Sequence, residues 1–245
     1  MKVLGIDIGG SAVKGAPVDT TTGQLLSERL KIETPKALTP LAMAKTVASL
    51  AQAFQWRGPI GVGFPGVVRG PRVLTSANLH KGFINRDVQA LFAKATGCRV
   101  ALINDADAAG LAEMRLGIGR GEAGSVLLLT LGTGIGSSLF NRGQLVQNTE
   151  LGHLPIRGRS AERFVSSAAR KRRRLDWPAW GRELGGYLQI LEEILWPEMI
   201  ILGGGASAKH KKFLRYVKCR TRVVPAAFHN EAGIVGAAVW GAEAR

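Results

Sequence analysis

The sequence predicts an α/β protein assembled from two copies of a strand–turn–strand unit. Short apolar runs typical of strands alternate with longer segments in which apolar residues recur at helical spacing. An apolar strand, a glycine turn, a second strand, a polar glycine turn and a third strand occur at residues 3–26 and again at 125–146. With 245 residues, 46% of them hydrophobic, the chain is long enough for one large domain or two small lobes with a real core.

The first half of the chain begins with a predicted β meander. A strand over 3–8 ends at a Gly-Gly turn, a second strand follows over 12–19, and a Thr-Gly turn leads into a third over 24–32. Pro40 favours a helix that starts there, because proline is tolerated at the first helical position. The later predicted elements of this half are helices over 40–54, 87–96 and 106–116, and strands over 60–64 and 100–103.

The second half repeats this opening and then changes character. Its predicted elements are strands over 125–131, 137–141, 144–146 and 199–202, a helix over 180–195 and a Gly/Ala-rich tail helix over 230–244. Two glycine turns, one in each repeated unit, are expected to offer backbone N–H groups to a phosphate.

The charge balance indicates a polyanionic partner or substrate. The chain carries 33 Lys and Arg against 18 Asp and Glu, a net charge of +15. Residues 157–222 hold 16 of these basic residues against 6 acidic ones, with the densest run at 170–174. The alternative is a solvated basic face with no partner, which is what charge runs usually form.

Several classes of protein are excluded by what the sequence lacks. Cys98 and Cys219 are too few for a disulfide framework or a zinc cluster. No apolar run approaches the roughly 20 residues of a membrane span, and Asp7 interrupts any signal-like core. We therefore expect a reduced, cytoplasmic protein without a membrane partner.

A carboxylate just before the first glycine turn is the first motif with chemical meaning. Asp7 precedes Gly9 and Gly10, and glycine lets a backbone approach phosphate oxygens without a Cβ in the way. A carboxylate there could hold a hydrated Mg²⁺. Lys14 is a candidate phosphate contact. The alternative is an ordinary strand followed by a tight turn.

A polar cluster follows the predicted strand over 100–103. Asn104 and Asp105 come directly after the apolar run, where a carboxylate oriented by a neighbouring amide suits a general base for a hydroxyl. The alternative is an N-capping carboxylate, common at such a position. Asp105 is the better candidate base, and Asp107 the candidate helix cap.

Glu150 and His153 supply a carboxylate and an imidazole three residues apart. This spacing could serve adjacent sugar hydroxyls, or it could supply two metal ligands. Because no third ligand accompanies them in a matching motif, we favour hydroxyl binding. A lone histidine is more often structural, so this motif depends on its context.

The motifs occur in a collinear order that resembles the ROK family of sugar kinases, and more specifically its polyphosphate glucokinase branch. The resemblance covers residues 3–241. It rests on motifs that are weak singly but strong in order: Asp7–Gly10, Gly63–Gly66, Asn104–Asp107, Leu131–Gly136, Glu150–His153 and Gly203–Gly205, with branch-like segments at Lys14–Asp19, Thr75–Leu79, Asp105–Glu113, Asn148–Leu154 and Trp177–Trp180.

The resemblance implies an actin-like fold of two lobes with ribonuclease-H-like cores and an active site between them. The lobes would be 1–106 with 231–245, and 107–230. Asp105 would be the catalytic base for the sugar 6-hydroxyl. The implied glucose contacts are Gly66, Asn78, Asn104, Asp105, Glu150, His153 and Glu162. The implied phosphate contacts are Asp7, Gly9, Gly10, Ser11, Lys14, Gly132, Thr133, Gly134 and Gly204, with Asp7 holding Mg²⁺ through water.

The basic excess then favours inorganic polyphosphate as the phosphoryl donor, because an extended polyanion benefits from an extended basic track. The candidate track residues are Arg170, Lys171, Arg172, Arg173, Arg174, Lys209, Lys211, Lys212 and Arg215. ATP stays open as a further donor. The alternatives are an ATP-dependent kinase for glucose or another sugar and, less favoured, a basic nucleic-acid-binding protein, for which no recognition helix or stacking motif is evident.

Departures from the family pattern exclude two of its features. Many family members carry a cysteine-rich zinc cluster after the Glu-x-Gly-His segment, whereas here no cysteine follows until Cys219, so zinc is not expected. The first predicted strand starts at residue 3, so we expect no helix-turn-helix of a regulatory member ahead of it. A homodimer is typical of the family.

Overall fold

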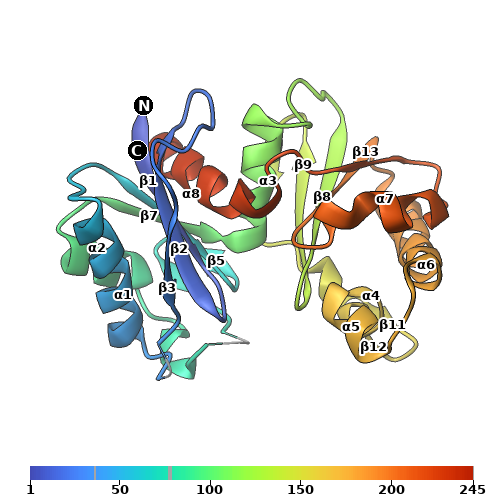
Figure 1. The fold of residues 1–245 in the computed structure, drawn as a ribbon, viewed down its shortest axis with the longest axis horizontal. Helices are drawn as coiled ribbons and strands as arrows, with labels where there is room; N and C mark the ends of the chain where they lie inside the picture. The colour runs from blue at the N-terminus through green and yellow to red at the C-terminus, as the bar shows by residue number, and fades with distance from the viewer. Residues whose placement is uncertain (36, 77–78, 245) are drawn as a thin grey trace. The chain divides into compact units, whose positions relative to one another are not determined.

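The computed structural model describes residues 1–35, 37–76 and 79–244, which divide into two compact units (Figure 1). The first unit comprises residues 1–112 and the C-terminal segment from Glu231, and the second comprises Glu113–Asn230. We expected the division at 106/107, one residue into the helix predicted over 106–116. The units instead divide near the end of that helix, because its first turns pack on the C-terminal helix of the first unit: a Cβ at Gly236 would lie 1.6 Å from the Ala108 carbonyl oxygen.

The first unit is built on a five-stranded sheet in the order β3-β2-β1-β4-β7. Its strands are β1 (Lys2–Ile8), β2 (Ala12–Asp19), β3 (Leu30–Glu33), β4 (Ile60–Phe64) and β7 (Val100–Asn104). The first three pair antiparallel, whereas β4 and β7 run parallel to β1. Its helices are α1 (Pro40–Ala53), α2 (Val88–Thr96), α8 (Ala232–Glu243) and the larger part of α3 (Asp105–Leu116), with η1 (Lys81–Phe83) and the short pair β5 (Val68–Arg69) and β6 (Arg72–Val73).

The helices of this unit begin and end where their sequences dictate. The Thr39 side chain accepts a hydrogen bond from the Ala42 N–H at the start of α1, and Asp87 caps α2 in the same way through Ala90. Gly97 ends α2 in the left-handed conformation that glycine adopts freely. Figure 1 shows α1 and α2 together on one side of the sheet and α8 on the other.

Alternation along the strands explains these two layers. Leu4, Ile6 and Ile8 of β1 are fully buried in one core cluster together with apolar residues of α1 and α2. The residues between them face α8, where glycine lets the helix backbone approach the strand backbone. A Cβ on Gly61 of β4 would lie 1.7 Å from the Ala237 carbonyl oxygen, so only glycine fits there.

The second unit repeats the same sheet plan in the order β10-β9-β8-β13-β14. Its strands are β8 (Ser125–Leu131), β9 (Ile135–Asn141), β10 (Gln144–Val146), β13 (Met199–Gly203) and β14 (Arg222–Pro225). Strands β8, β9 and β10 are antiparallel and β13 and β14 run parallel to β8, as β4 and β7 do to β1. This match of order and direction confirms the internal repetition read from residues 3–26 and 125–146.

The helices of the second unit pack around a core that includes Trp180, Leu184 and Leu188 of its longest helix. They are α4 (Glu162–Val165), α5 (Ser167–Arg172), α6 (Trp177–Leu195) and α7 (His210–Phe213), with the 3₁₀ turns η2 (Leu151–His153), η3 (Ser207–Lys209), η4 (Leu214–Tyr216) and η5 (His229–Glu231, at the join between the units) and the pair β11 (Pro155–Ile156) and β12 (Arg159–Ser160). Among the described residues no helix combines the length and apolarity needed to cross a bilayer.

Several sequence predictions differ from the structure. The third strand, expected over 24–32, is confined to Leu30–Glu33 because only an isolated bridge joins Leu25 to Val18. The helix expected from Ala106 starts at Asp105. Helices α4 and α5 were not predicted, because they are one or two turns long and mostly polar, so they carry no apolar period.

Candidate functional site

The Asn104 side chain organises the junction between β7 and α3. Its Oδ1 accepts hydrogen bonds from the Ala106 N–H at 2.8 Å and the Asp107 N–H at 3.0 Å. Its Nδ2 donates to the Gly66 carbonyl oxygen at 3.0 Å. The structure thus brings together Asn104 and Gly66, two of the expected glucose contacts. The prediction that Asp107 caps this helix is wrong, because the Asn104 side chain accepts the Ala106 and Asp107 N–H groups, whereas Asp107 lies inside the first turn of α3 and is buried.

Asp105 is the first residue of α3 and lies directly after a fully buried strand. Its Oδ1 accepts the Ala106 N–H at 2.9 Å, and its side chain is half-buried. The N-terminus of a 12-residue helix favours a negative charge, so the ionised carboxylate is stabilised there. An oriented, partly accessible carboxylate of this kind can accept a proton from a bound hydroxyl. The expected glucose contact Asn78 lies outside the described residues.

Asp7 lies near the end of β1, paired across the hairpin with Lys14 of β2. Burial raises the pKa of the Asp7 carboxyl, and the positive charge of Lys14 opposes that shift. The neighbouring helix leaves room for the carboxylate, because a Cβ at Gly233 would lie 3.0 Å from its Cγ. The described part of the chain has no group of three or more ligand side chains that could enclose a metal. A single carboxylate fits Mg²⁺, which usually keeps several waters and binds through one or two carboxylates and substrate phosphates.

Each of the two glycine turns is closed by a hydrogen bond that one of its own backbone N–H groups donates within the turn. The Gly9 N–H donates to the Ala12 carbonyl oxygen at 3.0 Å, and the Gly132 N–H donates to the Gly134 carbonyl oxygen at 3.1 Å. Gly9 and Gly132 therefore shape their turns and do not offer an N–H to a phosphate. Of the expected cradle residues, Gly10, Ser11, Thr133 and Gly134 remain as proposed contacts.

His153 lies between two carboxylates of the second unit. Its Nε2 is 3.5 Å from Glu150 Oε2, and its Nδ1 is 3.8 Å from Glu162 Oε1. Desolvation raises the pKa of Glu150, the nearby His153 lowers it, and Glu162 raises it. The other oxygen of Glu162 accepts the Ile135 N–H at 3.3 Å, next to the Gly132–Gly134 turn. The structure thus joins three expected glucose contacts into one cluster of hydrogen-bonding groups suited to neighbouring hydroxyls.

Buried polar side chains hold the segment that carries Glu150, and no motif in the sequence predicted them. The Tyr187 hydroxyl of α6 donates to the Leu151 carbonyl oxygen at 3.0 Å. The Ser137 hydroxyl donates to the Thr149 carbonyl oxygen at 2.6 Å and accepts the Leu151 N–H at 3.0 Å. Tyr187 and Ser137 therefore hold the backbone on either side of Glu150.

Removing the Tyr187 hydroxyl tests this positioning. We expect Tyr187→Phe to raise the KM for glucose about fivefold, the size of one neutral hydrogen bond, while kcat changes little. Tyr216→Phe is the control, because that hydroxyl accepts from Arg215 at 2.7 Å, outside the cluster. Steady-state kinetics of both variants provide the check, and an unchanged glucose KM in Tyr187→Phe would contradict the assignment.

A cavity of about 340 Å³ opens beside the second glycine turn. Its lining is Leu131, Gly132, Thr133, Ser167, Ala168, Arg170, Lys171, Trp177, Gly205, Ala206 and Lys209, all in the second unit. Three positive side chains face a glycine turn there, an arrangement suited to phosphate groups. The lining includes Gly205 and not the expected Gly204. Gly204 adopts φ +73° beside the Leu131 backbone and thereby shapes the turn that carries Gly205.

Most of the expected basic track lies outside this cavity. Arg173 donates to both carboxylate oxygens of Glu183, at 2.5 and 2.8 Å, and this pairing raises the pKa of Arg173. Arg172 donates to the Arg163 carbonyl oxygen at 2.8 Å. The other expected track residues that the cavity lining does not include are Arg174, Lys211, Lys212 and Arg215. Of the expected track, Arg170, Lys171 and Lys209 reach the cavity.

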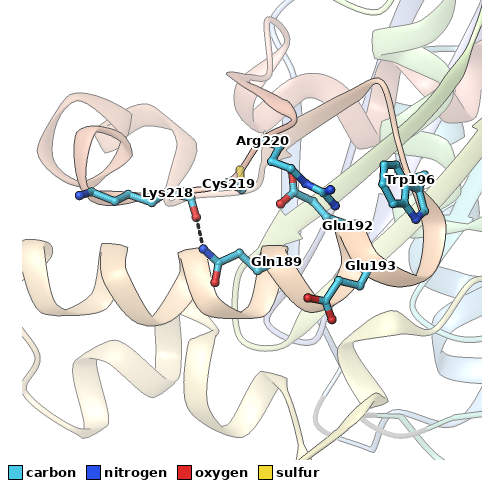
Figure 2. A pocket seen from close by; sticks show the side chains of 7 residues that line it. All are labelled: Gln189, Glu192, Glu193, Trp196, Lys218, Cys219 and Arg220. Carbon is cyan, nitrogen blue, oxygen red and sulfur yellow. Dashed lines mark hydrogen bonds between the residues drawn. The ribbon is translucent and has the colours of Figure 1, made fainter.

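A second cavity, of about 560 Å³, holds none of the expected site residues (Figure 2). It is lined by Gln189, Glu192, Glu193, Trp196, Lys218, Cys219 and Arg220. Gln189 donates to the Lys218 carbonyl oxygen at 2.8 Å, and the Arg220 guanidinium lies 4.3 Å from the Trp196 ring centroid. These contacts fasten the end of α6 to the segment that leads into β14.

Cys219 in this cavity offers a test of the local electrostatics. Desolvation and the negative charge of Glu192 raise the pKa of Cys219 to about 11. At pH 8 only about one thiol in a thousand is then the reactive thiolate. In a Cys98→Ser background we expect alkylation by iodoacetamide to accelerate about tenfold per pH unit between pH 8 and 10. A rate that levels off near pH 9 would contradict this, and the urea-unfolded chain provides the fast reference.

Comparison with known proteins places the chain in a family. The ROK family profile matches residues 3–170. Polyphosphate glucokinase of Mycobacterium tuberculosis is 47% identical over 96% of this chain and 89% of its own length. The crystal structure of the inorganic polyphosphate/ATP-glucomannokinase of Arthrobacter sp. strain KM is 44% identical with a TM-score of 0.95, covering 100% of this chain and 99% of that one. A ROK family glucokinase of Streptomyces griseus, 23% identical with a TM-score of 0.83 over 97% of this chain and 98% of that one, shares the fold.

The chain therefore belongs to the ROK family. Within that family it lies in the branch of the polyphosphate glucokinases. The predicted α/β, two-lobed actin-like fold class is confirmed by these structures and by the two matching sheets.

Proposed function

We propose that this chain is a polyphosphate-dependent glucokinase, a kinase that transfers the terminal phosphoryl group of inorganic polyphosphate to the 6-hydroxyl of glucose, with ATP as a second donor. The observation that carries the proposal is the basic cavity beside the Gly132–Gly134 turn. It occurs in a chain 47% identical to a polyphosphate glucokinase and 44% identical to a polyphosphate/ATP-glucomannokinase.

The acceptor is activated by Asp105 in this proposal. The carboxylate accepts the proton of the glucose 6-hydroxyl as the hydroxyl oxygen attacks the terminal phosphorus. The bond between that phosphorus and the bridging oxygen breaks, and the electron pair leaves with a polyphosphate one unit shorter. Asn104, Glu150 and His153 hold the other sugar hydroxyls. The Gly66 carbonyl oxygen accepts a hydrogen bond from the Asn104 side-chain amide and so helps to orient that amide toward the sugar.

The donor is held mainly by charge. Arg170, Lys171, Lys209 and Thr133 line the donor cavity. In this proposal the three cations neutralise phosphate oxygens, and the backbone N–H groups of Thr133 and of Gly134, in the same turn, approach the transferred group. Positioning and charge neutralisation are the main contributions a protein makes to phosphoryl transfer. Asp105 belongs to the first unit and the donor cavity to the second.

Mg²⁺ is the proposed cofactor, with Asp7 holding it through water. When bound, the ion supplies positive charge to the donor phosphates. Lys14, the cross-strand neighbour of Asp7, adds a fixed positive charge at the same end of the sheet. We also propose a cytoplasmic homodimer. The two free cysteines, Cys98 and Cys219, support a reducing compartment, and sedimentation of the purified chain tests the dimer.

The proposal is tested by glucose 6-phosphate formation from glucose and Mg²⁺, with long-chain polyphosphate or ATP at equal terminal-phosphate concentration. We expect faster turnover with polyphosphate than with ATP. Turnover with ATP alone would mean that the basic cavity binds a nucleotide and not polyphosphate. If neither donor gives product, the proposal is overturned. A donor-free reaction is the blank.

A further inference from the structure

The donor cavity contains an aromatic side chain that a nucleotide base would be expected to use. Trp177 is the single aromatic residue among the described residues that line it. Nucleotides bind through their phosphates and through stacking of the base, and an indole is a strong stacking partner. Whether the Trp177 ring is accessible therefore decides which donors the cavity favours.

The Trp177 ring is already covered. The Arg170 guanidinium lies 3.9 Å from the centre of the indole, within the range of a cation–π contact, and Lys209 lies 6.0 Å from the same centre. Phe213 stacks on the indole at 5.9 Å with an interplanar angle of 19°, and Trp180 meets it edge-on at 5.7 Å. The ring therefore presents a cation to the cavity in place of a bare aromatic face.

Arg170 is fixed on the ring by a second contact. Its Nη1 donates to the Leu175 carbonyl oxygen at 2.9 Å, while its Nε is buried without a hydrogen-bond partner among the described residues. The contact with Leu175 and the stacking on Trp177 together hold the guanidinium, with its positive charge, in the cavity lining, where it can meet an anion. A phosphate chain supplies acceptor oxygens along its whole length, whereas the base of a nucleotide supplies no negative charge.

We propose that Arg170, stacked on Trp177, determines the donor preference: it favours a chain of inorganic phosphates and excludes the base of a nucleoside triphosphate from the indole face. This inference rests on the proposed kinase function and assigns its donor specificity to one residue. Trp177 acts as the platform that positions the guanidinium, and Arg170 is the group that touches the donor.

The test compares donors in Arg170→Ala. We expect kcat/KM for long-chain polyphosphate to fall about tenfold or more, the size of one charge-assisted hydrogen bond. With ATP we expect kcat/KM to hold or rise, because the uncovered indole face now accepts adenine. Adenosine, which carries a base and no phosphate, is the direct probe: it should inhibit Arg170→Ala competitively against ATP and leave the wild-type chain unaffected.

Two variants separate this role from a general loss of charge. Lys171→Ala removes a positive charge from the same cavity without uncovering the indole, so both donors should weaken by similar factors. Arg182→Ala, an exposed position of α6 outside the cavity lining, should leave both donors unchanged. Arg170→Lys keeps the charge but lacks the flat guanidinium, and it replaces Arg170→Ala if thermal melting shows that the alanine variant does not fold.

The outcomes distinguish this inference from the proposed function. An unchanged ratio of polyphosphate to ATP kcat/KM in Arg170→Ala, or in Arg170→Lys where that variant replaces it, overturns the role of Arg170. Competitive inhibition of the wild-type chain by adenosine overturns it too, because the indole face would then be open. A wild-type chain that forms no glucose 6-phosphate from either donor overturns the kinase function itself, and the inference with it.

Discussion

Asp105→Asn is expected to lower kcat for glucose phosphorylation by about 10²–10⁴-fold, the range that a positioned general base contributes. An asparagine amide has the size of the carboxylate and can still accept the Ala106 N–H, which Asp105 now binds at 2.9 Å. It cannot accept a proton from the sugar hydroxyl at neutral pH. The loss should therefore fall on kcat, with the KM values for glucose and polyphosphate and the thermal stability nearly unchanged.

Asp176→Asn is the matched control for this variant. Asp176 caps α6 by accepting the Ala179 N–H at 2.7 Å, and asparagine caps a helix as well as aspartate does. Its kcat should equal that of the wild-type chain. If Asp105→Asn keeps more than about a tenth of the wild-type kcat, another group removes the proton and the assignment of Asp105 is wrong.

Gly61→Ala is expected to destabilise the first unit by at least about 3 kcal/mol, at or beyond the upper end of ordinary overpacking. The new methyl group would lie 1.7 Å from the Ala237 carbonyl oxygen of α8, and backbone cannot move aside as a flexible side chain can. The helix must shift away from β4, which also disturbs its contact with β1. Thermal melting followed by circular dichroism should show a Tm lower by roughly 6–12 °C or more.

Gly186→Ala provides the opposite expectation for the same chemical change. Gly186 is an exposed position of α6, and a Cβ there meets no atom within 4 Å among the described residues. Alanine should stabilise this helix by about 0.5–1 kcal/mol, because glycine loses more backbone entropy on folding. Equal Tm values for Gly61→Ala and the wild-type chain would contradict the close packing of α8 on β4.

The fold was largely predictable because its signals are local and repeated. Fully apolar five-residue runs such as 60–64 form buried parallel strands, and the repeated meander marks the two sheets. The close approach of α8 could not be predicted. Gly5 and Gly61 read as ordinary strand glycines until the helix from the other end of the chain is placed against them.

The site was predictable where one motif supplies it and unpredictable where distant segments meet. Asn104 and Asp105 follow a strand directly, so their position at a helix start is encoded locally. The count of charged residues revealed the basic segment, but it could not show which basic side chains are paired with other residues. Arg173 forms an ion pair with Glu183, ten residues away, and the Arg170 guanidinium stacks on the Trp177 ring. A count of charges shows neither contact.

The most direct test of the central claim follows the phosphorus itself. The purified chain is incubated with glucose, Mg²⁺ and long-chain polyphosphate, and the reaction is followed by ³¹P NMR with Asp105→Asn in parallel. We predict that one sugar phosphate ester at the 6-position appears for each phosphate unit lost from the polyphosphate, and that the variant is nearly silent. Loss of polyphosphate to free inorganic phosphate without the ester, or ester formation that needs ATP, would contradict the account.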